Sequence, residues 1–80
     1  MITREAVAER ILELCKEKGI TINGIANLSA IPPSTVKSII YGVSKNPGIV
    51  TIKMICDGFN ISLPDFFDSD FFYDLEQEIK

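Results

Sequence analysis

Apolar residues recur every three or four positions along most of the chain, which is the spacing of α-helices that bury one side. The first predicted helix begins at Thr3, a candidate N-cap, and stops at Gly19. Its apolar stripe consists of Val7, Ile11, Leu12, Leu14 and Cys15. No segment of any length shows the strict alternation of a half-buried strand, so the sequence predicts an all-α fold.

Two short helices joined by a tight turn are predicted over residues 21–42. Thr21 is expected to cap the first helix, and Pro33 falls at the first position of the second, where its fixed φ suits a helix. Gly42 is expected to end the pair as a left-handed cap. The apolar residues that would bury one side of both helices are Ile25, Leu28, Ile31, Val36, Ile39 and Ile40.

The side of the second helix that would face outward is small, polar and cationic. At the helical rotation of about 100° per residue, Ser34, Lys37, Ser38 and Tyr41 fall opposite the arc of Val36 and Ile40. Between Gly19 and Cys56 the chain contains no Asp or Glu. A paired-helix element without a carboxylate to repel phosphate is a candidate for the DNA major groove.

Two further helices and a tail complete the pattern. One helix follows Pro47-Gly48, and another starts at Ser62 and feeds Leu63, Phe66 and Phe67 into the core. The inward stripe of the former is Ile49, Ile52, Ile55, Cys56 and Phe59. We therefore expect a five-helix domain over residues 1–68 and an acidic tail over residues 69–80. The tail repeats Phe71, Phe72, Leu75 and Ile79 at helical spacing, which predicts a short sixth helix packed on the domain or against a second subunit.

The charge of the chain is divided between its two parts. Residues 1–56 carry seven basic and four acidic residues, a net charge of +3, whereas residues 57–80 carry one basic and seven acidic residues, a net charge of −6. The total of −3 therefore conceals a basic-to-neutral body and an acidic tail. Because net charge bears on partners, we expect the tail to point away from any bound phosphate.

The chain lacks the residues that catalysis, metal binding and cofactor binding usually require. The chain has no histidine, no glycine-rich phosphate loop and no closely spaced cysteine pair, so we expect no enzyme, no metal site and no cofactor. Cys15 and Cys56 lie on apolar helix faces, which favours buried free thiols over a disulfide. The absence of a long apolar run or a signal-like N-terminus predicts a cytoplasmic protein without a membrane segment. Eighty residues leave no room for a separate ligand domain, so we also expect no small-molecule ligand.

Residues 6–67 resemble the Cro/phage-repressor type of helix-turn-helix regulator, the XRE-like family. The resemblance rests on the joint spacing of many positions, among them Thr21, Ile25-Ala26, Ala30-Ile31, Val36, Ile39, Gly42, Pro47, Ile52, Ile55 and Phe66. It implies a compact lambda-repressor-like domain that places the helix from residue 33 in the major groove of double-stranded DNA, usually as a homodimer. It also implies a transcriptional regulator, which we expect to be a repressor of phage or mobile-element origin.

The resemblance assigns individual residues to the DNA. The base-reading positions fall on Pro33, Ser34, Lys37 and Ser38, and the phosphate-contacting positions fall on Asn23, beside Ile22, and on Ser44, Lys45 and Asn46. Tyr41 is a further candidate backbone contact, and Lys53 or Arg10 could add a cation. Pro33 and Ile22 stand where the family often has a long polar side chain, so specificity is expected to rest on Lys37, Ser34 and DNA shape. The alternative is an antitoxin-like or adaptor protein whose acidic tail binds a basic partner.

Overall fold

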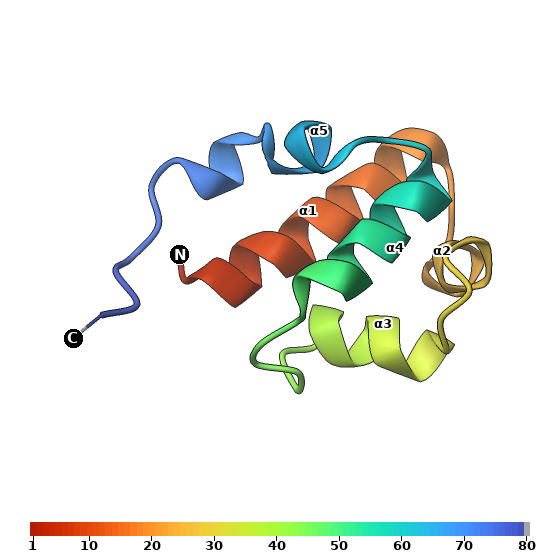
Figure 1. Ribbon diagram of the computed structural model, residues 1–80, viewed down its shortest axis with the longest axis horizontal. Coiled ribbons are helices and arrows are strands. Elements are labelled where there is room, and N and C mark those ends of the chain that lie inside the picture. The colour runs from red at the N-terminus through yellow and green to blue at the C-terminus, as the bar shows by residue number, and fades with distance from the viewer. Residues whose placement is uncertain (80) are drawn as a thin grey trace.

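The computed structural model describes residues 1–79, which form five α-helices and one 3-10 turn, with no strand in that range. The elements are α1 (Thr3–Lys18), α2 (Ile22–Leu28), α3 (Pro33–Ile40), α4 (Ile49–Phe59), α5 (Leu63–Phe67) and the 3-10 turn η1 (Asp70–Phe72). Figure 1 shows α5 along one edge and α3 along the opposite edge, with α1 and α4 between them. The expected all-α, five-helix fold is confirmed.

All five helices contribute to a single core. Each supplies one large side chain that is 0% exposed, namely Ile11, Ile25, Val36, Ile55 and Phe66 in chain order. Helix α2 packs against α3 and α4, and α1 packs against α3 and η1. Because each short helix gives its apolar side to the same cluster, the relative orientation of α2 and α3 is fixed by the whole domain.

The ends of the helices follow the sequence signals closely. Gly19 has a φ of 65° and ends α1 as expected, with the Ile20 N–H donating to the Cys15 carbonyl at 2.9 Å. Asn60 takes the same left-handed conformation after α4. The hydroxyl of Ser62 accepts a hydrogen bond from the Asp65 N–H at 3.1 Å and caps α5. These caps satisfy backbone groups that helix termini would otherwise leave unpaired.

The start of α1 differs from expectation, because Thr3 is not its N-cap. The cap position is Ile2, whose N–H donates to Glu5 Oε1 at 3.2 Å. The Thr3 hydroxyl donates instead to Glu78 Oε2 at 2.8 Å, so a partner 75 residues away replaces the local one. Glu5 is thus the residue that satisfies the first turn of α1.

Three apolar residues that we expected on buried stripes are exposed. Leu28 at the end of α2 and Ile49 at the start of α4 are 60% and 58% exposed, and Leu12 lies at the rim of its stripe. Leu28 and Ile49 occupy terminal turns, where the neighbouring chain turns away and leaves one side of the helix uncovered. Helical spacing identifies the face of a helix but does not show how far its packing partner extends.

Arg10 is buried between α1 and α5. Its Nε donates to the Phe66 carbonyl at 2.7 Å and its Nη2 donates to the Asp65 carbonyl at 2.8 Å. A third nitrogen pairs with Glu13 on the surface side. Arg10 therefore supplies donors to the carbonyl groups at the end of α5, and its burial inside the domain leaves little of it exposed for the phosphate contact that we had considered.

The tail forms less helix than its spacing predicted. Only η1 is helical, and the chain from residue 73 to residue 79 has no regular structure. Asp70, Asp74 and Glu78 would stand four residues apart on a continuous helix, and such like-charge pairs disfavour it. The Phe72 ring lies 5.0 Å from the Phe67 ring and 6.1 Å from the Phe66 ring, centroid to centroid.

The rest of the tail runs beside the start of α1. The Glu76 N–H donates to the Met1 carbonyl at 3.1 Å, two residues before Glu78 bonds Thr3. Phe71 and Leu75 are half-buried, whereas Ile79 is 87% exposed. The division into residues 1–68 and 69–80 stays a prediction, although Phe72 contacts the aromatic side chains of α5. Lys80 lies outside the described residues.

Candidate nucleic-acid interface

The paired helices α2 and α3 are held by backbone features at the turn between them. The Thr21 hydroxyl accepts a hydrogen bond from the Gly24 N–H at 3.0 Å and caps α2 as expected. Ala30 has a φ of 58°, and the next residue, Ile31, donates its N–H to the Ala26 carbonyl at 3.1 Å. This left-handed turn reverses the chain within a few residues, so that α3 starts directly against α2.

Helix α3 begins at two consecutive prolines. Pro32 is its N-cap, with a φ of −61° and a ψ of 141°, and Pro33 is its first residue. Proline leaves no backbone donor to satisfy at that position, and Pro32 has the extended conformation that a following proline favours. No side chain caps α3, and in its first turn the Thr35 N–H donates to the Pro32 carbonyl at 3.0 Å.

Burial divides α3 into the two sides that its spacing predicts. Val36 and Ile39 are buried and Ile40 is partly buried against the core. On the other side Ser34, Lys37 and Tyr41 are exposed and Ser38 is half-buried. Of the four positions assigned to base reading, Pro33 is also half-buried, so Ser34 and Lys37 protrude most. This side can offer a flexible cation and small hydroxyl groups to a base edge or a phosphate.

The loop after α3 is folded back onto that helix. Gly42 has a φ of 79°, as the expected left-handed residue, and the Ser44 N–H donates to the Ser38 carbonyl at 2.9 Å. Ser44 is half-buried by this turn, whereas Lys45 and Asn46 are exposed. Among the residues assigned to the backbone, Asn23 is exposed on the first turn of α2. The structure thus brings the loop residues Ser44, Lys45 and Asn46 to the C-terminal end of α3, whereas Asn23 lies on α2.

Sequence reasoning missed Arg4, which also lies at this end. Its Nη1 donates to the Gly42 carbonyl at 3.0 Å, which connects the first turn of α1 to the C-terminal end of α3. One signal was present in the sequence, because a basic residue in the first turn of a helix opposes the helix dipole and so indicates a role elsewhere.

The three lysines expected to contact DNA, Lys37, Lys45 and Lys53, differ in whether they pair with a carboxylate. Lys37 and Lys45 are exposed, and neither pairs with a carboxylate of residues 1–79. Lys53 on α4 is also exposed but pairs with Asp57, one turn further along the same helix. The cations around α3 are therefore Lys37, Lys45 and Arg4, and the carboxylates of Glu5 and Glu9 line a hollow with Arg4 and the end of α3.

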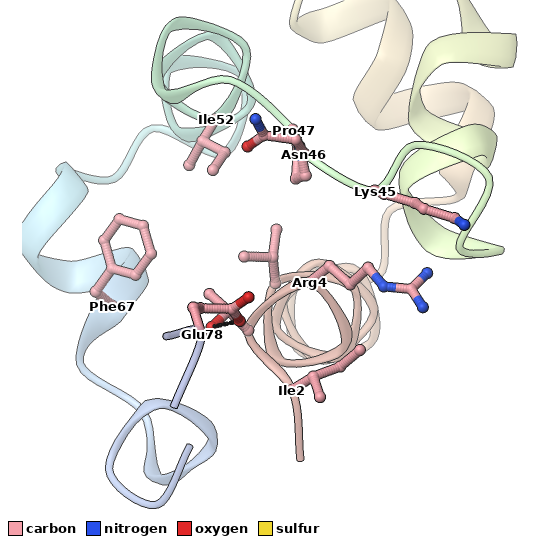
Figure 2. Close-up of a pocket in the computed structure, with 10 residues that line it drawn as sticks. Ile2, Arg4, Lys45, Asn46, Pro47, Ile52, Phe67 and Glu78 are labelled. Carbon is pink, nitrogen blue, oxygen red and sulfur yellow. Dashed lines mark hydrogen bonds between the residues drawn. The ribbon is translucent and has the colours of Figure 1, made fainter. Parts of the chain in front are cut away.

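A cavity of about 550 Å³ opens between α1, α4 and the loop after α3. Figure 2 shows Ile52 and Phe67 on one side of it, Glu78 at its edge, and Arg4 and Lys45 extending together in the opposite direction. Its floor is apolar, because Val7 and Ile52 are buried core residues. Glu78 lines the same cavity as Lys45, but Figure 2 shows the Lys45 side chain extending away from Glu78, so the orientation of the tail relative to α3 stays a prediction.

The remaining chemistry of the described residues is limited. Cys15 and Cys56 are buried free thiols, as expected. Burial raises the pKa of both thiols, which favours the unreactive protonated form. Residues 1–79 contain no cluster of three or more histidine, cysteine or carboxylate side chains suited to a metal ion. None of the helices in the same range has the length and apolar character that crossing a membrane requires.

Comparisons with known proteins agree with this architecture. A search of curated proteins finds no match. The crystal structure of the prophage Lp1 protein 11 superposes with a TM-score of 0.80 at 38% sequence identity, covering 94% of this chain and all of that one. A model of the Cro/C1-type HTH DNA-binding domain matches residues 10–70, which include all of α2, α3, α4 and α5. The chain belongs to the Cro/C1-type helix-turn-helix family of DNA-binding regulators.

Proposed function

We propose that this DNA-binding regulator is a transcriptional repressor that inserts α3 into the major groove. The observation that carries the proposal is the outward side of α3, where Ser34 and Lys37 are exposed, Ser38 is half-buried and no carboxylate lies nearby in the sequence. Lys37 can donate to guanine N7 and O6, and the serines can bond several base edges. Pro33 offers only an apolar contact, such as one to a thymine methyl group.

The residues flanking α3 would position it on the duplex. Asn23 at the start of α2, with Ser44, Lys45 and Asn46 in the loop, supplies donors for phosphate oxygens on either side of the groove. Tyr41, which is 69% exposed at the end of α3, adds a hydroxyl group. Such contacts set register and orientation but carry no base information directly.

We further propose that the protein binds as a homodimer. Two recognition helices related by a two-fold axis would read half-sites about one turn of the duplex, roughly 34 Å, apart. Ile79 and the exposed edge of the tail are candidate contacts between subunits, since Ile79 is a large apolar side chain that is 87% exposed. The similarity to a prophage protein supports a phage or mobile-element origin.

Binding to mixed-sequence duplex DNA over a range of salt concentrations tests the electrostatic part of this proposal. If a dimer places Lys37 and Lys45 of each subunit on phosphates or bases, the log–log slope of affinity against salt should be about −3.5 or steeper. A slope near zero at measurable affinity would contradict DNA binding by this surface.

Selection of bound sites from random duplexes tests the assignment of base reading. Lys37→Ala should weaken the preferred site by about 1–3 kcal/mol and flatten the preference at one position of each half-site. Lys45→Ala is the matched control, because loss of a phosphate contact should weaken all sequences about equally. If both variants only scale the affinity, α3 does not read bases as proposed.

The alternative of a protein-interaction module is less well supported by the structure. Phe72 already packs against the aromatic rings of α5, and the segment beyond it bonds to the start of α1. A partner that used the tail would first have to displace these contacts.

A further inference from the structure

Arg4 occupies a position that helix energetics alone would not favour. It lies in the first turn of α1, where the positive end of the helix dipole opposes a cation. The structure holds it there through its bond to the Gly42 carbonyl, which lies just beyond the C-terminal end of α3. Carbonyl groups at a helix C-terminus carry partial negative charge, so α3 stabilises the cation that α1 destabilises.

The bond to Gly42 uses only one of the N–H groups of the Arg4 guanidinium. The guanidinium presents five N–H groups in a planar fork, and one nitrogen, Nη1, serves Gly42. Arg4 lines the cavity that also includes Lys45 and Asn46, and it lines a second hollow with Tyr41 and Gly42. Figure 2 shows Arg4 and Lys45 reaching toward the same side, away from Phe67 and Glu78.

We infer that Arg4 is a DNA-backbone contact that binds phosphate together with Lys45 while its Nη1 fixes the end of α3. This inference rests on the proposed function, and it adds a residue from α1 to an interface otherwise built from α2, α3 and the following loop. A planar fork and a neighbouring ammonium group suit the oxygens of one phosphate or of two adjacent phosphates.

Two carboxylates bear on this site and must be included. Glu5 and Glu9 line the second hollow with Arg4 and lower its attraction for an anion. Glu5, however, already accepts the N–H of Ile2 at the cap of α1. Arg4 would therefore bind phosphate beside two carboxylates, so its contribution to the salt slope should not exceed that of one ordinary cation.

The experiment compares the salt slope of the wild-type chain with that of Arg4→Gln and Arg4→Lys, using a mixed-sequence duplex. Arg4→Gln removes one charge, so the slope should become shallower by about 0.9 for each subunit bound. Arg4→Lys should keep the wild-type slope. Lys16→Gln removes one charge from the exposed last turn of the same helix, at the opposite end from Arg4, and should leave the slope unchanged.

A second variant separates the charge from the bond to Gly42. Ligation of a synthetic segment of residues 1–14 to a chain beginning at Cys15 allows citrulline at position 4, which has nearly the shape of arginine and keeps a donor but carries no charge. If Arg4→Gln lowers the melting temperature, the citrulline chain provides the decisive slope. A slope shallower by about 0.9 for each subunit supports the inference.

The outcomes distinguish this inference from the proposed function. If the wild-type slope is steep and the citrulline chain matches it, Arg4 only positions α3 and the inference is overturned, while DNA binding stands. If the wild-type chain shows no salt-dependent binding, both the proposed function and the inference fail.

Discussion

At the scale of single residues, the contact between α2 and α4 leaves no room for a side chain at Gly58. A Cβ built there would lie 2.4 Å from Ser29 Oγ and 3.1 Å from both Ser29 N and Ile25 Cδ1. The Ser29 hydroxyl is itself buried and finds no hydrogen-bond partner within residues 1–79. Gly58 therefore allows α4 to approach the helix that supports α3, at some cost in helix propensity.

Gly58→Ala should destabilise the protein by about 2 kcal/mol, because overpacking at this contact exceeds the gain in helix propensity. Urea unfolding measures the change. Ser29→Ala removes the nearest atom and an unpaired hydroxyl, so in the double variant much of the loss should be recovered. Gly48→Ala, where a Cβ meets nothing within 4 Å, is the matched control. Equal stability of Gly58→Ala and the wild type would contradict the tight approach.

At Ala30, in contrast to Gly58, a glycine would fit better than the residue present, because a side chain disfavours the backbone conformation that the turn requires. Its φ of 58° is left-handed, and it is exposed. Ala30→Gly should stabilise the domain by about 0.5–1 kcal/mol, because the relief of left-handed strain outweighs the added freedom of the unfolded chain. Thermal unfolding should show a higher melting temperature. Ala8→Gly, inside α1, should instead lower it, and a loss of stability in Ala30→Gly would mean that the turn is not strained.

At the scale of helices, local signals in the sequence predicted most of the architecture. Thr21, Ser62, Gly19 and Pro33 act at helix ends through bonds or dihedral angles that involve only nearby residues, so their roles were readable. The start of α1 was not, because the Thr3 hydroxyl bonds a residue at the far end of the chain.

In the candidate site, too, some features were predictable from the local sequence and others depended on tertiary packing. The outward and inward sides of α3 follow from helical rotation alone, whereas the position of Arg4 depends on how α1 packs against α3. Arg10 lies three residues after Val7 and four before Leu14, within the apolar stripe, which was a sign of its burial. Its acceptors on α5 could not be inferred, because no local rule relates residues 55 or 56 positions apart.

At the scale of the whole molecule, the tail joins the two ends of the described chain on one side of the domain. Phe72 packs on α5, and the segment that follows runs beside the start of α1, as Figure 1 shows. Ile79 extends beyond these contacts. The tail therefore offers two distinguishable surfaces, one turned to its own domain and one turned to solvent.

Substitutions at these two positions separate the two uses of the tail. Phe72→Asp places a charge among aromatic rings and should lower the stability by about 3 kcal/mol, seen as a lower melting temperature with no change in mass by sedimentation. Ile79→Asp should leave the melting temperature of the monomer unchanged. If Ile79 contacts a second subunit, this variant instead lowers the mass in solution and weakens binding to a two-fold site. No effect of Phe72→Asp would show that the aromatic cluster contributes nothing.

The bonds of Arg10 also bear on how the protein is made. Phe66, which closes the core, and the two carbonyl groups that hold Arg10 belong to the last helix of the domain. During synthesis, α2 and α3 leave the ribosome before the residues that complete the packing around α1. Because an incomplete core holds short helices poorly, the emerging chain gains a DNA-binding shape only after residue 66 is free to fold back. We therefore expect DNA binding to appear late in translation, once the buried residues of α5 are in place.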